Sequence, residues 1–317
     1  MSMFLAIFIR HCQRLGVSWR SVVISRPARL QRDKFSLLIE QEQSARVPFE
    51  DIAIIVLNHR EITLTHPVLS ACGEYGISMF ATGDTHHPNG VFPPYLQHSR
   101  ATRMLRKQLA APKPLIKQTW AAIIRQKIIN QGLCLELTAS AGGEQMASFA
   151  LQVRSGDSTM MESQAAAFHF ARLFGCKFGR SQLTWTNAAL NYGYAILRGA
   201  IARGLVAHGF FPSIGLFHSS EQNAFNLADD IIEPFRPVID LHVATHRSED
   251  TADLLPIDKV ELVALLNADI QMPRGTMSVL SAIEQSIESV ARVLDQGHDK
   301  LLELPTLIGL DQHQREC

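Results

Sequence analysis

The hydrophobic pattern changes its period near residue 93, and this change constrains the fold more than any other feature of the sequence. Residues 19–81 carry short runs of β-branched and aromatic residues, such as Phe35–Ile39 and Ile52–Leu57, separated by turn-prone or charged residues. From Tyr95 onward, apolar residues recur every three and four positions. The pattern therefore predicts an α+β chain, with a small β-rich domain over 17–92 and a larger all-α domain over 93–317.

Eight amphipathic helices are predicted in the second domain, with proline or glycine in many of the breaks between them. A loop containing His86–Gly90 and Pro93–Pro94 precedes them and marks the domain boundary. The predicted helices are Leu96–Leu109, Leu115–Gln131, Glu144–Arg154, Met161–Phe174, Thr186–His208, Asn223–His246, Ile257–Ile270 and Met277–Leu302.

The charge of the chain is balanced overall but unevenly distributed. Its 30 Lys and Arg residues offset its 30 Asp and Glu residues. Residues 1–120 nevertheless hold 15 basic against 8 acidic side chains, and residues 241–317 hold 6 against 13. This distribution excludes a bulk polycation. It leaves a locally basic N-terminal half that could meet a polyanion, with the acidic C-terminal part facing away from it.

Cysteine content and hydropathy both predict a cytoplasmic protein that does not cross a membrane. The five cysteines are widely spaced and form no Cys-x-x-Cys pair, which argues against a disulfide framework and a zinc knuckle. No apolar stretch approaches the ~18 residues needed to span a bilayer. The start of the chain also lacks the charge order of a secretory signal.

Three carboxylates crowd one short predicted helix, at Asp229, Asp230 and Glu233. Spacings of three and four residues place like charges side by side on a helix, where they repel. A divalent cation would relieve that repulsion, and so would a basic partner such as Arg236. A solvated helix face, on which water screens the charges, is the alternative interpretation.

Two prolines make the same segment unusual for a packing helix. In a continuing helix, Pro234 and Pro237 would leave the carbonyls of Asp230 and Glu233 without their usual donors. The segment is therefore predicted to kink at a functional site. His218 could equally be a core or capping histidine, and Glu162 could be a first-turn glutamate favoured by the helix dipole.

Four segments occur in the order typical of one known family. They are Trp19–Ile24, Glu162–Gly175, Asn187–Tyr194, and His218 followed by Asn223–Pro237. Together they resemble the CRISPR-associated integrase family, in the branch found with type II systems, and the match runs from about Val17 to the C-terminus. Residues 1–16 have no counterpart and are expected to be an N-terminal extension, with Val17 as the natural start. The chain differs from the family pattern at His169, at Ser219 and Ser220, and at Thr184 and Trp185.

The resemblance implies a metal site within the helical domain. The family's ligands are a glutamate, a histidine and a later acidic residue, which correspond here to Glu162, His218 and Glu233. Hard oxygen donors with one imidazole favour Mg²⁺ or Mn²⁺. Asp230, Asn191 and Arg236 are expected to support these catalytic ligands.

The resemblance also implies an activity and a set of partners. The activity is metal-dependent integrase and endonuclease chemistry on double-stranded DNA in CRISPR adaptation: a 3′-hydroxyl attacks a phosphodiester and inserts a spacer into the repeat array. The implied assembly is a homodimer with a small ferredoxin-like subunit. Two alternatives stay open, namely a non-catalytic DNA-binding scaffold of the same fold and a generic metal-dependent DNA-repair nuclease.

One basic stripe is a candidate DNA contact. Arg100, Arg103 and Lys107 share a face of the first predicted helix, where they could contact phosphates. A solvated helix face is the alternative.

Overall fold

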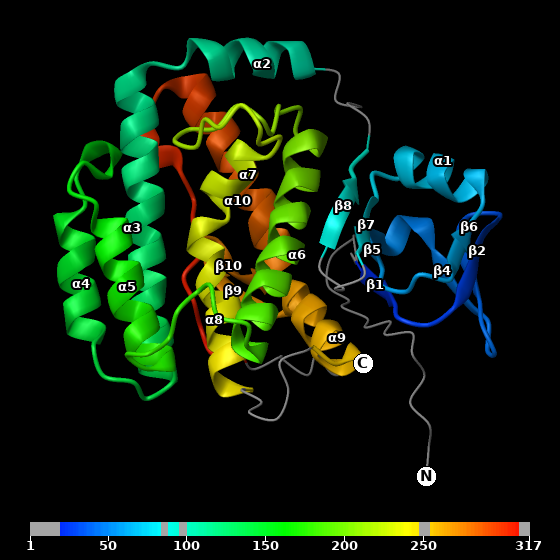
Figure 1. The fold of residues 1–317 in the computed structure, drawn as a ribbon. Helices are drawn as coiled ribbons and strands as arrows, with labels where there is room; N and C mark the ends of the chain where they lie inside the picture. Colours follow the sequence, from blue (N-terminus) through cyan, green and yellow to red (C-terminus); the bar gives the residue numbers. More distant parts are fainter. Residues whose placement is uncertain (1–19, 84–87, 95–99, 247–253, 311–317) are drawn as a thin grey trace.

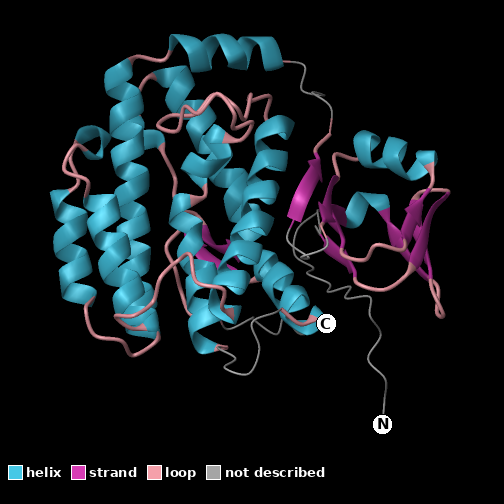
Figure 2. Cartoon of the chain, viewed as in Figure 1, coloured by secondary structure: helices cyan, strands magenta, loops and turns pink. Residues whose placement is uncertain are grey.

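The computed structural model describes residues 20–83, 88–94, 100–246 and 254–310. The expected extension over 1–16 lies outside these residues. A β-rich N-terminal part lies beside a larger helical body, as Figures 1 and 2 show. The α+β class predicted from the change of period is therefore confirmed.

The N-terminal part contains two four-stranded sheets. In the first, β1–β5 and β5–β7 are parallel and β7–β8 is antiparallel. The second has the order β4-β3-β2-β6, and helix α1 and a 3-10 turn at Phe49–Asp51 accompany the sheets. The elements are β1 Arg20–Ile24, β2 Ala28–Asp33, β3 Ser36–Glu40, β4 Ala45–Pro48, β5 Ile52–Leu57, β6 Ile62–Leu64, α1 His66–Glu74, β7 Ser78–Thr82 and β8 Pro88–Phe92.

The sequence of strand β5 is apolar throughout because each face of the strand packs into a different core. Ile52 and Ile55 belong to the core of the N-terminal part, whereas Ile54 and Val56 belong to the core shared with the helical body. A strand that is buried on both faces has no polar side. The first sheet is consequently the layer through which the two parts of the chain are joined.

Nine helices and a two-stranded hairpin form the described helical body. Among the residues placed, no helix is both long and apolar enough to cross a bilayer. The elements are α2 Ala101–Ala110, α3 Lys113–Leu137, α4 Gly143–Gln152, α5 Met161–Phe174, α6 Trp185–Ala207, α7 Asn226–Ile231, α8 Arg236–Thr245, α9 Pro256–Ala264, β9 Asp269–Met272, β10 Gly275–Ser278 and α10 Val279–Gln296.

The hairpin corrects the prediction that the second domain is all-α. Strands β9 and β10 pair antiparallel, with Ile270 opposite Met277, where the ends of two predicted helices were expected. Pro273 interrupts any helix, and Gly275 adopts a φ of +124° that favours glycine. Apolar spacing over so short a stretch did not distinguish a strand from a helix.

Helix α6 is the central packing element between the helical body and the first sheet. A Cβ atom built on Gly199 would lie 1.8 Å from a ring carbon of Phe80 on β7. On another face of α6, a Cβ on Gly193 would lie 2.6 Å from Ile239 of α8. Glycine at these positions allows close approach of both neighbours, which fixes α8 and its preceding turn against α6.

The kink predicted from the two prolines is present. Helix α7 ends at Ile231, the 3-10 turn Glu233–Phe235 follows, and α8 starts at Arg236. Glu233 is the first residue of this turn and is buried. Figure 1 shows this segment beside α3.

Candidate metal centre

Glu162 lies in the first turn of α5, whose start is fixed by one carboxylate. Asp157 accepts hydrogen bonds from the backbone N–H groups of Met161 at 2.9 Å and Glu162 at 3.0 Å. It thereby satisfies donors that a helix N-terminus leaves unpaired. The Glu162 side chain stays 31 % exposed, so it can reach a ligand from the solvent side.

The turn that carries Glu233 is held in place by the side-chain amide of Asn130 on α3. Asn130 Nδ2 donates to the carbonyl of Pro234 at 2.7 Å and to that of Pro305 at 2.9 Å, and Asn130 Oδ1 accepts from the N–H of Leu307 at 3.1 Å. Asn130 is fully buried. This one side chain therefore ties the Glu233 turn, α3 and the C-terminal segment together.

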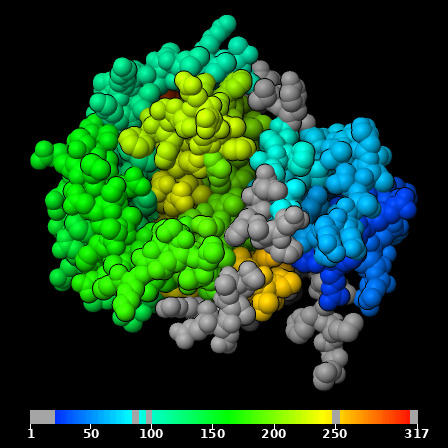
Figure 3. Space-filling view, in the orientation of Figure 1, coloured from blue at the N-terminus to red at the C-terminus, as the bar shows by residue number. Residues whose placement is uncertain are grey.

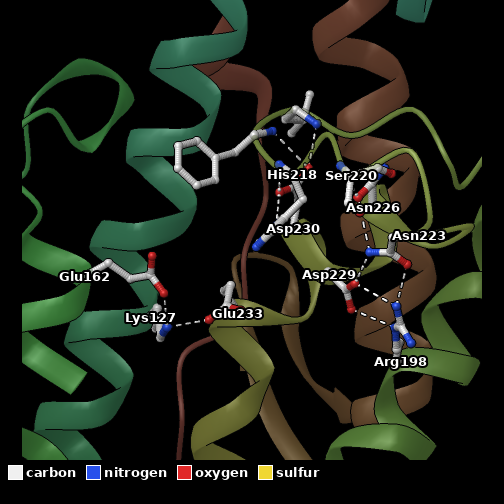
Figure 4. Close-up of polar contacts among 12 residues, drawn as sticks. Lys127, Glu162, Arg198, His218, Ser220, Asn223, Asn226, Asp229, Asp230 and Glu233 are labelled. Carbon is white, nitrogen blue, oxygen red and sulfur yellow. Dashed lines mark hydrogen bonds and ion pairs between the residues drawn. The ribbon is translucent and has the colours of Figure 1, made fainter. Parts of the chain in front are cut away.

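Lys127 of α3 lies between the two predicted glutamate ligands (Figure 4). Its Nζ is 2.7 Å from Oε1 of Glu162 and 2.5 Å from Oε2 of Glu233. Arg236 Nε takes the other oxygen of Glu233 at 2.9 Å. The fold thus brings the two carboxylates, which are far apart in sequence, onto a single positive charge.

The pKa values of this group reflect competing effects. Burial alone would raise the pKa of Glu233, but Lys127 and Arg236 outweigh it and lower the value to about 2. Burial acts to lower the pKa of Lys127, and Glu233 and Glu162 outweigh it and raise that pKa. Glu233 and Lys127 are therefore both charged at neutral pH.

His218 stands beside the pair, oriented by Asp230. Its Nδ1 lies 2.7 Å from Oδ1 of Asp230, which also accepts the backbone N–H of His218 at 3.1 Å. Oδ2 of Asp230 accepts the N–H groups of Leu216 at 2.5 Å and Phe217 at 3.1 Å. The hydrogen bond to Asp230, opposed by partial burial, raises the pKa of His218. It commits Nδ1 and leaves Nε2 for a ligand.

Each of the three crowded carboxylates has a different basic partner. Asp230 pairs with His218 and Glu233 with Lys127 and Arg236. Asp229 instead points to α6, where Arg198 Nε lies 2.7 Å from its Oδ1. This separation, not water on a solvated face, relieves the repulsion that the sequence predicted.

Aromatic rings line one side of the histidine. Trp120 lies on α3 two helical turns before Lys127, and therefore on the same face of the helix. Its ring stacks on that of Phe217 with centroids 4.5 Å apart, and it meets the His218 ring edge-on at 5.9 Å. Figure 3 shows the yellow α7–α8 segment recessed between green helices and the loop that precedes α7. Phe217 is 52 % exposed.

The Glu162 and Glu233 pair fits a divalent ion, although the described part of the chain holds no group of three His, Cys, Asp or Glu at metal-binding geometry. The two ion-pair distances place Oε1 of Glu162 and Oε2 of Glu233 within about 5 Å of each other. Ligand oxygens across a Mg²⁺ ion are about 4 Å apart. The ammonium between them shows that the pair accommodates a cation, and the Oε2 contact lacks hydrogen-bond geometry.

The other predicted residues have different surroundings. Arg236 contacts Glu233 as expected, and its guanidinium lies 4.6 Å from the Tyr194 ring centroid. The amide oxygen of Asn191 accepts from Arg180 at 2.6 Å. No contact between placed residues joins Asn191 to the three predicted ligands.

The basic stripe on α2 is partly paired within the chain. Lys107 and Arg103 both form ion pairs with Asp295 of α10, the latter at 3.6 Å. Arg100 lies just before α2 and is exposed. His169, one of the departures from the family pattern, is fully buried with Nε2 3.2 Å from Asp240, so it contributes to the core.

Sequence reasoning missed Lys127 and Trp120. The available signal was that Lys127 lies three and four residues after Ile124 and Ile123, on the apolar face of the predicted helix, because a buried ammonium requires a carboxylate partner. Trp120 gave no comparable signal, since an aromatic residue in a buried helix is ordinary core.

The model of the family described as CRISPR associated protein Cas1 matches residues 22–168 and 174–254. A protein named CRISPR-associated endonuclease Cas1 from Neisseria meningitidis is 41 % identical over 305 residues, which cover 95 % of this chain and all of the relative. This chain belongs to the Cas1 family. The family resemblance inferred from the four motifs is thereby confirmed. A Thermus thermophilus Cas1 endonuclease is 27 % identical, over 67 % of this chain and 70 % of the relative.

Solved structures share the Cas1 fold at low sequence identity. A casposase bound to an integration product has a TM-score of 0.72 and 16 % identity, covering 88 % of this chain and 91 % of the other. A Thermotoga maritima Cas1 protein has a TM-score of 0.69 and 16 % identity, covering 87 % and 97 %. A Cas6-RT-Cas1–Cas2 complex has a TM-score of 0.69 and 14 % identity, covering 93 % of this chain and 37 % of that one.

Proposed function

We propose that this Cas1 chain is a metal-dependent DNA integrase of CRISPR adaptation, which joins short DNA to the repeat array. The observation that carries the proposal is the convergence of Glu162 and Glu233 on one cation, with His218 near enough for the charge of Glu233 to raise its pKa. A relative that is 41 % identical is named an endonuclease, and this name supports an activity on DNA phosphodiesters.

Glu162, His218 and Glu233 would hold Mg²⁺ or Mn²⁺, which fits two oxygen donors and one imidazole. When bound, the ion supplies stabilisation of negative charge on the transferring phosphate and the leaving oxygen. Asp230 keeps His218 Nε2 available, and Arg236 orients Glu233 through Oε1.

The attacking group comes from the substrate. A DNA 3′-hydroxyl attacks a repeat phosphodiester and displaces the adjacent 3′-oxygen, so one phosphodiester bond forms as another breaks. No covalent enzyme intermediate is required, and we assign no nucleophilic role to Ser219 or Ser220. Both serines are exposed beside His218, where they can contact the DNA backbone.

We infer double-stranded DNA and a second CRISPR-associated subunit as partners. The integration product in the casposase structure and the Cas1–Cas2 assembly support this inference by likeness of fold. A homodimer with a small ferredoxin-like subunit is the arrangement proposed here, acting in the cytoplasm where the repeat array lies. Arg100, Arg103 and Lys107 are the proposed phosphate contacts, and Asp295 competes with DNA for Arg103 and Lys107.

An integration assay tests the proposal. The protein and its partner subunit are incubated with Mn²⁺, a short labelled duplex and a supercoiled plasmid carrying the repeat. Transfer of label into the plasmid by wild type, and its loss in Glu233→Ala, is the expected result. Nicked plasmid without transferred label would indicate a nuclease instead, and a shifted but intact plasmid would indicate a scaffold.

A further inference from the structure

We propose that the Lys127 ammonium is a built-in counter-cation of the candidate metal centre, which a divalent ion must displace from Glu162 and Glu233. This inference rests on the proposed function, because it takes the two glutamates as metal ligands. Lys127 is then the residue that sets the metal affinity of the centre. It also keeps the acidic pair neutralised when the protein folds without metal.

The oxygens of Glu162 and Glu233 that could join one metal ion are the ones that contact Lys127. Arg236 donates to Oε1 of Glu233, so Oε2 is the oxygen left for a metal. That same Oε2 lies 2.5 Å from Lys127 Nζ. On the other glutamate, Oε1 of Glu162 accepts a hydrogen bond from the same ammonium at 2.7 Å. An ion that joins both glutamates through these oxygens therefore takes the position of the ammonium.

The charges around the two glutamates also favour displacement of Lys127. Lys127 and Arg236 balance Glu162 and Glu233, so the four groups together are neutral. A divalent ion added to that set would leave two uncompensated positive charges in a centre where Glu233 and Lys127 have only 5 % and 7 % of their side chains exposed. Buried charge of one sign is strongly unfavourable. Departure of one cation halves this excess of positive charge.

Lys127 is the cation that can leave. Arg236 is fixed by its hydrogen bond to Glu233 and by the Tyr194 ring, 4.6 Å from its guanidinium carbon. The Lys127 ammonium instead sits on a flexible four-carbon chain, and it lacks the planar donor geometry by which a guanidinium is held to a carboxylate. Removing its charge should therefore favour metal binding, whereas a purely architectural lysine would weaken metal binding when lost.

Calorimetric titration of the full chain with Mn²⁺ tests the sign of this effect. Lys127→Met should bind Mn²⁺ at least ~10-fold more tightly than wild type, since a competing charge has been removed. Its melting temperature in chelator should fall and should recover when Mn²⁺ is added. Lys117→Met is the matched control, because Lys117 is exposed on the same helix, and it should change neither quantity. Unchanged or weaker Mn²⁺ binding by Lys127→Met would overturn the inference.

Glu233→Gln separates this inference from the proposed function. If wild type and Glu233→Gln bind Mn²⁺ equally well, the acidic pair is not the metal site and both proposals fail. If Glu233→Gln loses Mn²⁺ binding while Lys127→Met binds as wild type does, only the counter-cation inference fails.

A measurement on the unaltered protein covers the case in which Lys127→Met does not fold. Amine acylation followed by peptide mass spectrometry reports how accessible each lysine is. Lys127 should be protected in chelator and become several-fold more reactive at saturating Mn²⁺, while Lys117 reacts equally in both conditions. Continued protection of Lys127 in wild type that has bound Mn²⁺ would contradict displacement.

Discussion

Asp230 Oδ1 lies 2.7 Å from His218 Nδ1, and the Asp230 side chain is completely buried while His218 is 41 % exposed. The pair therefore joins a buried carboxylate to an imidazole that solvent can reach. Asp230 also accepts three backbone N–H groups from the loop before α7, so it holds both the histidine and the loop that carries it.

Asp230→Asn should weaken Mn²⁺ binding by roughly 10–100-fold, the usual loss when a ligand histidine is deprived of its carboxylate partner. The amide has one acceptor oxygen for four N–H donors, so the free energy of unfolding should also fall. Calorimetry and thermal melting measure the two effects. Asp229→Asn, whose partner is Arg198, is the comparison variant and should leave Mn²⁺ affinity within a few-fold. Equal losses in both variants would contradict a specific role for Asp230.

Alanine substitution at Glu162, His218 or Glu233 should each lower the rate of strand joining by at least ~100-fold. The losses should be non-additive in combination, because ligands of one centre fail together. DNA affinity should stay within a few-fold, since phosphate contacts elsewhere supply most of it. The joining assay and a mobility-shift titration measure these quantities. A Glu233→Ala protein that joins ends at the wild-type rate would remove Glu233 from the site.

Gly199→Ala should lower the free energy of unfolding by about 1–3 kcal/mol or more, because the new methyl group overlaps the Phe80 ring. Gly73→Ala in α1 has open space at its Cβ position and should stabilise the protein by about 0.5–1 kcal/mol. Chemical denaturation of both variants makes the comparison. If Gly199→Ala proves as stable as Gly73→Ala, the close packing of α6 on β7 is wrong.

His242 should make stability depend on pH below neutrality. Burial, with a smaller contribution from the neighbouring His246, lowers its pKa to about 4. The unfolded histidine has a pKa of about 6.5, so the unfolded chain binds more protons between these values. Stability is therefore lost as the pH falls from about 6.5 towards 4.

In His242→Gln, the melting temperature should change less between pH 6.5 and pH 5 than it does in wild type. Each unit by which the pKa of His242 is lowered corresponds to roughly 1.4 kcal/mol of stability that protonation removes. His66→Gln, exposed on α1, should keep the wild-type slope. If the melting temperatures of His242→Gln and wild type fall equally with pH across this range, His242 is not the source of the pH dependence.

The sequence could predict features that depend on local chemistry. The change of hydrophobic period gave the α+β class, and Pro234 and Pro237 gave the kink that presents Glu233. The four ordered motifs gave the family. These signals are carried by neighbouring residues or by fixed spacings, so they are readable without coordinates.

Contacts between distant segments could not be predicted in the same way. The position of Lys127 between Glu162 and Glu233 depends on how α3 packs against α5 and the α7–α8 turn, and no local pattern encodes it. The division of Asp229 and Asp230 between Arg198 and His218 has the same origin. The hairpin was missed because Ile270 and Met277 suit a helix as well as a strand.

The hydrogen bonds of Asn130 impose an order on biosynthesis. Asn130 leaves the ribosome long before Pro305, which is 175 residues further along the chain, yet it needs both Pro305 and Leu307 to complete its partners. At typical elongation rates of 5–20 residues per second, the delay is about 10–35 s. During that interval the turn bearing Glu233 lacks its final support. A chain that has not yet been synthesised as far as Leu307 therefore lacks two of the hydrogen bonds through which Asn130 ties this turn to the C-terminal segment.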